Sequence, residues 1–146
     1  MRVLVVSTYE LGHQPLMAAT AAAALAAAGH DVACVDLAVE ELDPRRIDDV
    51  AAVAFAVPMH TATRVALAAV EAVRGLHPDM AVCLFGLYAE AGDEALRAAG
   101  GGAAFDGEYV ADLVRWAGDL ARSPAQAGEV ATTTSLTPSA SPLPLR

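Results

Sequence analysis

The strongest constraint on the fold is a repeated alternation of short apolar runs with segments of helical spacing. The apolar runs predict β-strands at 2–7, 31–37, 50–57, 80–86 and, more weakly, 102–105. Helical segments are predicted between and after them, at 15–28, 61–76, 90–99 and 108–122. Strands that are apolar throughout are typical of parallel sheets covered by helices on both faces. The sequence therefore predicts a doubly wound, Rossmann-like α/β domain with five parallel strands in the flavodoxin-like order 2-1-3-4-5.

The residues between the elements agree with this interpretation. Gly29 follows the first helix and supplies the left-handed residue that commonly ends helices, and the glycines at 100–102 predict a turn before the last strand. We therefore assign residues 1–122 to one α/β domain. From residue 123 to residue 146 the chain is rich in Ser, Thr, Pro and Ala, so we expect a disordered tail that folding does not need.

Composition excludes several classes of partner. The net charge is −9, and Arg45 and Arg46 are the only adjacent basic residues, so the clustered cations that nucleic acid requires are missing. No apolar segment reaches the ~20 residues of a membrane span. No signal peptide is evident, and we expect a cytoplasmic protein. Cys34 and Cys83 lie inside apolar runs and are expected to be buried free thiols.

Ligands of open α/β sheets bind beyond the carboxyl ends of the strands, which sorts the histidines. His13 follows the first strand and His60 follows the third, whereas His30 and His77 belong to the opposite edge. Because the first and third strands are neighbours in the predicted order, we expect a pocket between their ends where His13 and His60 converge. The other candidate residues at this edge are Ser7, Thr8, Tyr9, Glu10, Met59, Thr61, Gly86, Leu87, Tyr88, Glu90, Gly107 and Glu108.

Several chemistries lack their motifs. The chain contains no Lys, so a Walker A phosphate loop is impossible, and no Gly-x-Gly-x-x-Gly follows the first strand. No nucleophile elbow is present either, so nothing predicts catalysis by this chain alone. A metal site of His13, His60 and either Glu10 or Glu108 is chemically sensible and stays open. The alternative is structural, with His13 hydrogen-bonded in its loop and His60 capping the third helix.

Residues 12–37, "GHQPLMAATAAAALAAAGHDVACVDL", resemble the start of the cobalamin-binding domain at the N-terminus of many radical S-adenosylmethionine enzymes. Three more stretches are similar to that family in the same order. "VPMHTATR" (57–64) matches its exit from the third strand, "FGLYA" (85–89) its loop after the fourth, and "DGEY" (106–109) its glycine–glutamate signature. The resemblance covers residues 1 to about 122.

The resemblance implies cobalamin as cofactor, bound at the edge residues named above, and a radical S-adenosylmethionine or methyltransferase partner protein. Two departures matter. The Cys-x3-Cys-x2-Cys iron–sulfur motif is absent, and so is the barrel that carries it. Cobalamin mutases have Asp-x-His-x-x-Gly after the first strand, whereas here Leu16 stands where that motif has Gly. The resemblance therefore implies that His13 shapes its loop and that no protein histidine binds the cobalt.

Three functions remain open on the sequence. The first is a stand-alone or truncated cobalamin-binding module that works with a separate partner. The second is a degenerate module of the same fold that binds no corrinoid and serves protein assembly. The third is a small metal- or nucleotide-dependent enzyme that uses His13 and His60.

Overall fold

A parallel sheet of six strands runs through the part of the chain that the computed structural model describes, residues 1–123 and 132–135. The strands are β1 (Arg2–Ser7), β2 (Asp31–Asp36), β3 (Ala52–Ala56), β4 (Ala81–Phe85), β5 (Ala103–Gly107) and β6 (Thr132–Ser135). Their order is β2-β1-β3-β4-β5-β6. The predicted arrangement of five parallel strands in the order 2-1-3-4-5 is confirmed, and β6 is added beside β5.

The sixth strand comes from the segment that was expected to be a disordered tail. Thr132–Ser135 pair in parallel with residues 104–107 of β5. In these four residues the chain departs from the expected disorder, because the outer edge of β5 offers unpaired backbone N–H and C=O groups. The rest of the expected tail, 124–131 and 136–146, lies outside the described residues.

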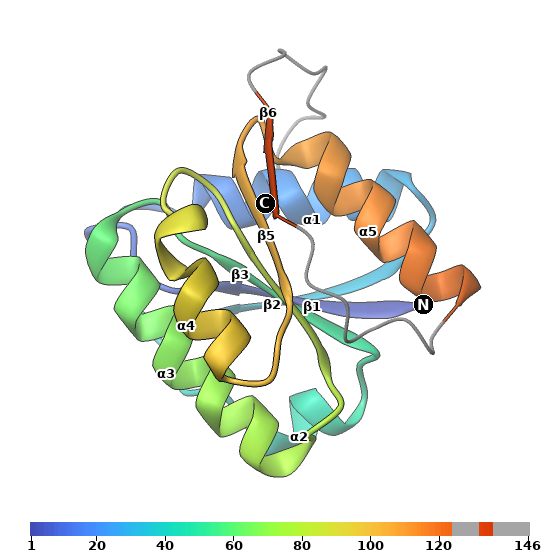
Figure 1. Cartoon of the computed structure of the whole chain (residues 1–146), viewed down its shortest axis with the longest axis horizontal. Helices are drawn as coiled ribbons and strands as arrows, with labels where there is room; N and C mark the ends of the chain where they lie inside the picture. Colours follow the sequence, from blue (N-terminus) through green and yellow to red (C-terminus); the bar gives the residue numbers. More distant parts are fainter. Residues whose placement is uncertain (124–131, 136–146) are drawn as a thin grey trace.

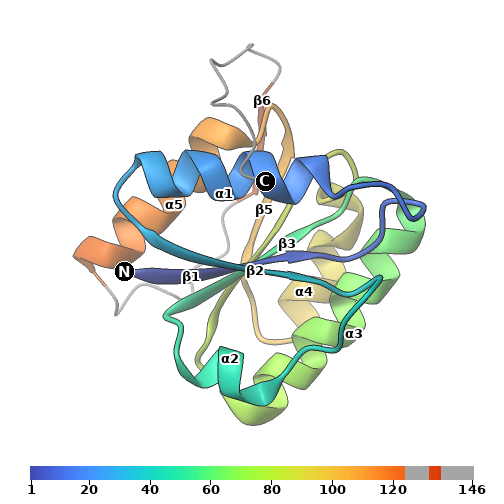
Figure 2. The same cartoon turned by 180° about the vertical axis from the view of Figure 1, so that it is seen from behind.

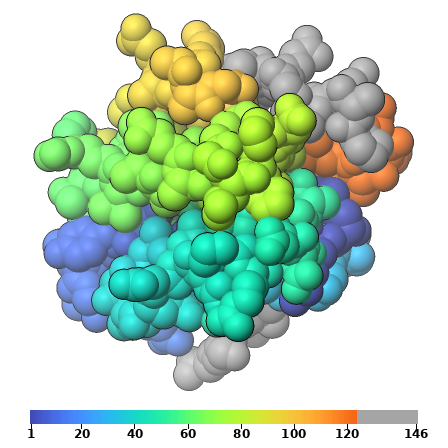
Figure 3. All heavy atoms as spheres, turned by 90° about the horizontal axis from the view of Figure 1, so that it is seen from below, coloured from blue at the N-terminus to red at the C-terminus, as the bar shows by residue number. Residues whose placement is uncertain are grey.

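Helices cover both faces of the sheet (Figures 1 and 2). On one face lie α1 (Leu16–Ala27) and α5 (Val110–Arg122); on the other lie α2 (Pro44–Asp48), α3 (His60–Leu76), η1 (Glu90–Gly92) and α4 (Asp93–Ala98). The predicted helix 90–99 is thus divided into η1 and α4, and α2 forms in a connection with no predicted helix. Figure 3 shows α3 crossing the second face beside α4. Over the described residues, no helix is long and apolar enough to span a membrane.

Successive side chains of the central strands enter two separate cores. Val3, Val5 and Phe85 pack with the buried residues of α1 and α5, whereas Leu4 and Phe55 pack on the opposite face. Alternate residues point to opposite faces of a strand, so a continuous apolar run supplies both cores. The central strands therefore have almost no polar side chains except at their ends.

The edge strand β2 is covered less well than the prediction implied. Cys83 in β4 is buried, as expected, but Cys34 in β2 is exposed, so the expectation of two buried thiols is wrong for Cys34. The reason is its position, because β2 is an edge strand of the sheet formed by the described residues, and α1 faces it with short alanine side chains. The Cys34 thiol nevertheless lies among apolar groups, and this partial burial raises its pKa.

The close contact of Gly102 with β4 gives a test of the fold. Gly102 has φ +153°, and a Cβ there would lie 2.8 Å from the Val82 carbonyl oxygen. We expect Gly102→Ala to lower the free energy of unfolding by about 1–3 kcal/mol, because both the φ and the contact become strained. Gly75→Ala in α3 is the control, since a Cβ there meets nothing within 4 Å. It should raise stability by up to about 1 kcal/mol. Urea unfolding measures both changes, and an unchanged Gly102→Ala would contradict this packing.

Candidate functional site

The loops that follow the parallel strands meet at one edge of the sheet, which we call the carboxyl edge. It comprises the residues directly after Ser7, Asp36, Ala56, Phe85 and Gly107. His13 and His60 belong to this edge, as expected, and His30 and His77 belong to the opposite one. The carboxyl edge is where α/β sheets of this topology bind ligands.

The ends of β1 and β3 are joined by backbone pairing and by a side-chain hydrogen bond. The two strands pair from Val3↔Ala52 to Ser7↔Ala56. Beyond the last pair, the buried Thr8 donates a 2.6 Å hydrogen bond from Oγ1 to the Ala56 carbonyl oxygen. The pocket that was expected between these two strand ends stays a prediction.

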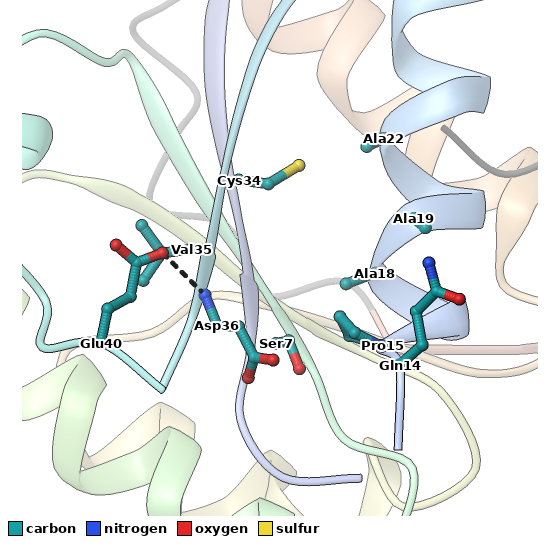
Figure 4. A pocket seen from close by; sticks show the side chains of 10 residues that line it. All are labelled: Ser7, Gln14, Pro15, Ala18, Ala19, Ala22, Cys34, Val35, Asp36 and Glu40. Atoms are coloured by element: carbon teal, nitrogen blue, oxygen red, sulfur yellow. Dashed lines mark hydrogen bonds between the residues drawn. The ribbon is translucent and has the colours of Figure 1, made fainter. Parts of the chain in front are cut away.

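A pocket opens between α1 and β2, with a volume of about 330 Å³ (Figure 4). It forms here because β2 is an edge strand and the alanines of α1 are too short to reach it. Helix α1 contributes Ala18, Ala19 and Ala22 to the wall. The other lining residues are Ser7, Gln14, Pro15, Cys34, Val35, Asp36 and Glu40.

Ser7 is the most buried polar residue of this pocket. Its side chain is at the end of β1, the residue is 1% exposed, and Oγ has no hydrogen-bond partner in the described part of the chain. A buried hydroxyl without a partner costs free energy, because it has lost water and gained nothing in return. Ser7 Oγ is therefore a group that a ligand in the pocket can satisfy.

Glu10 and Tyr109 meet at the start of α1. Burial raises the pKa of the Glu10 carboxyl, although the backbone N–H groups of Leu16 and Met17 act in the opposite direction. The Tyr109 hydroxyl donates to the Met17 carbonyl oxygen over 3.3 Å. Burial, aided by nearby carboxylates, raises the pKa of Tyr109 to about 12. These contacts connect the loop after β1, the first turn of α1 and the start of α5.

Gly86 brings the loop after β4 against the same turn of α1. Its φ is +111°, and a Cβ would lie 2.5 Å from the Met17 sulfur and 3.3 Å from the Val57 carbonyl oxygen. Only glycine fits this combination of backbone conformation and close approach. The loops after β1 and β4 therefore lie next to each other at the carboxyl edge.

Exposed apolar side chains gather at the carboxyl edge. Of the six large apolar side chains that are exposed in the described part of the chain, only Leu76 at the end of α3 lies elsewhere. The other five are Leu11, Leu16, Val39, Leu87 and Tyr88, which we call the apolar edge residues. Leu11 is 62% exposed and has φ +54°, an uncommon conformation for a residue with a Cβ. Strained residues of this kind cluster at functional sites.

The remaining predicted residues have varied surroundings. His13 and His60 are exposed; the His13 N–H donates to the Glu10 carbonyl oxygen over 2.9 Å, and His60 is the first residue of α3. No three His, Cys, Asp or Glu side chains among the described residues are grouped so that they could hold a metal ion. The triad of His13, His60 and a glutamate is therefore not formed. Thr61, Glu90 and Glu108 are exposed, Tyr9 and Met59 pack against the core beneath α3, and Gly107 has φ +62°.

Sequence reasoning missed the pocket and most of the apolar edge residues. Asp36 could have been found, because it ends a predicted strand and the rule that selected Ser7 applies to it equally. The exposure of Leu11, Leu16 and Val39 had no comparable signal, since large apolar side chains are expected inside. Only the path of the loops holds them at the surface.

The two hydroxyls at the end of β1 are expected to affect stability in opposite directions. Ser7→Ala removes a buried hydroxyl without a partner and should raise the free energy of unfolding by about 1 kcal/mol. Thr8→Val is the matched control; it removes a hydroxyl that is bonded and should lower stability by a similar amount. Thermal unfolding measures both variants. A Ser7→Ala protein that is less stable than the wild type would mean that Oγ is already satisfied.

Comparison with protein-family models and with curated proteins finds no match for this chain. Its function is inferred below from the carboxyl edge, from the pocket and from the resemblance of its sequence stretches.

Proposed function

We propose that this chain is a cobalamin-binding module. The observation that carries the proposal is the gathering of the apolar edge residues where an α/β sheet binds its ligands. A corrin ring is a large, flat and mostly apolar disc with amide groups around it. Exposed apolar side chains in one region mark an interaction site, because covering them removes apolar surface from water.

The residues present suit such a ring. Leu11, Leu16, Leu87 and Tyr88 would contact its apolar surface, and Gly86 and Gly107 keep the backbone free of side chains there. The exposed polar residues that could meet the amide groups are His13, His60, Thr61 and Glu108. When bound, cobalamin supplies the reactivity of its cobalt; the chain supplies position and cover.

His13 is assigned to the loop and not to the cobalt. The turn at Leu11 and Gly12, both with positive φ, and Pro15 before α1 fix the loop on either side of it. The His13 backbone N–H is bonded to Glu10 within this turn. Residues 10–16 also depart from the mutase motif. On that ground the sequence resemblance already implied the same role for His13.

The module would act with a radical S-adenosylmethionine or methyltransferase partner, since its sequence has no iron–sulfur cysteine motif. One observation favours a second function. The same apolar edge residues could be covered by another protein, which would make the chain an assembly module without a corrinoid. Binding of cobalamin to the isolated chain separates the two functions.

Hydroxocobalamin should stay with the folded wild-type chain in equilibrium dialysis and colour it. Leu87→Gln should weaken binding about tenfold or more, because covering one leucine contributes on the order of 1.5–3 kcal/mol. Leu11→Asn should also weaken it without loss of stability, since Asn tolerates positive φ. Leu76→Gln, at the opposite edge, is the matched control and should bind normally. A folded wild type that retains no cobalamin would reject this function. If Leu87→Gln then abolished association with a partner protein, the assembly function would stand.

The role of His13 has a separate test. His13→Ala should weaken cobalamin binding by about 1 kcal/mol, the size of one neutral hydrogen bond. The electron paramagnetic resonance spectrum of bound cob(II)alamin should show no histidine ligand in either protein. A nitrogen signature that disappears in His13→Ala would overturn the assignment and favour a mutase-like lower ligand.

A further inference from the structure

We infer that the pocket between α1 and β2 binds a ribonucleoside group, an aromatic base joined to a ribose with free hydroxyls. This site is distinct from the apolar edge residues and does not rest on the proposed binding of cobalamin. Its size, its polar end and its apolar wall each point to this ligand class.

The polar end of the pocket consists of Ser7 and Asp36, at the ends of two neighbouring strands. The two residues are register partners in the sheet. Figure 4 shows both side chains at the same end of the pocket, near Pro15. Ser7 Oγ is buried and without a partner, so it can both donate to and accept from a ligand hydroxyl.

Asp36 supplies the acceptor that a ribose requires. Its Oδ1 accepts a 3.0 Å hydrogen bond from the Ala38 N–H, which holds the carboxylate in place. Oδ2 takes no hydrogen bond from the described residues and can accept one from a ligand. An acidic residue near the end of the second strand binds ribose hydroxyls in nucleotide-binding α/β folds.

The opposite part of the pocket is apolar. Ala18, Ala19 and Ala22 line it from α1, while Cys34 and Val35 line it from β2. Figure 4 shows the Cys34 sulfur pointing across the pocket toward α1. A flat aromatic base fits between such walls. The volume of about 330 Å³ is at the small end of ligand pockets and suits a nucleoside better than a dinucleotide.

The charges near the pocket argue against a phosphate. Among the residues that the structure describes, its lining contains two carboxylates, Asp36 and Glu40, and no Arg or His. Arg46 lies nearby, but it bonds Glu40 over 3.2 Å and the Cys34 carbonyl oxygen over 3.0 Å. The glycine-rich turn that cradles phosphate is also missing after β1. The part of the ligand that enters the pocket is therefore a nucleoside that carries no phosphate.

Two sources present this chemistry, a free nucleoside such as adenosine and the benzimidazole riboside that ends the cobalamin molecule. Isothermal titration of the full chain with adenosine and, separately, with the riboside α-ribazole distinguishes them. Binding of either compound supports the site, and the tighter one identifies the source. Failure of both would overturn the inference. Neither titration contains cobalamin, so the outcome is independent of the equilibrium-dialysis test of the proposed function.

Variants locate the binding. For the compound that binds, Asp36→Asn and Ser7→Ala should each weaken affinity, the former about tenfold or more because it removes a charged acceptor. The 2′-deoxy form of that compound should bind more weakly to the wild type than the ribose form does. Asp36→Asn should reduce the affinity for the 2′-deoxy form little further. Glu41→Gln, an exposed carboxylate outside the pocket, is the matched control. Unchanged affinity in Asp36→Asn and Ser7→Ala, with both variants folded, would place the ligand elsewhere and overturn the inference.

Discussion

Burial of the central strands on both faces is the constraint on which the rest of the molecule depends. β1, β3 and β4 are apolar at nearly every position, and each can be covered only if helices pack above and below the sheet. Parallel pairing then places all carboxyl ends at one edge. Because the central strands carry almost no polar side chains except at their ends, the candidate binding residues collect at that edge.

Helix α1 shows how packing on this sheet creates a site. Its alanines bring the helix close to β1, and Leu25 anchors it in the core. The same short side chains leave β2 partly uncovered, so one helix both completes the core and opens a pocket at its margin. The space that larger side chains on α1 would fill is therefore available to a ligand.

Two regions of the carboxyl edge differ in chemistry. Near the loops after β1 and β4, large apolar side chains face outward, held by the contact between Met17 and Gly86. Near the end of β2, a buried hydroxyl and a carboxylate lie at one end of an otherwise mostly apolar pocket. The first region suits a broad apolar ligand or a protein surface, and the second suits a small group with hydroxyls. A corrinoid and a nucleoside are therefore separate proposals, with separate tests.

The sequence by itself determined five of the six strands, their order and the edge that holds the candidate residues, because apolar periodicity and chain order are local and topological properties. It placed Ser7, His13 and His60 at the correct edge. Only the tertiary structure decided that the Thr8 hydroxyl bonds to the end of β3, that Cys34 is exposed, and that Ser7 and Asp36 share a pocket. It also decided that Leu11 and Leu87 face outward. These features depend on how far side chains reach across the space between elements, and no local pattern in the chain encodes that distance.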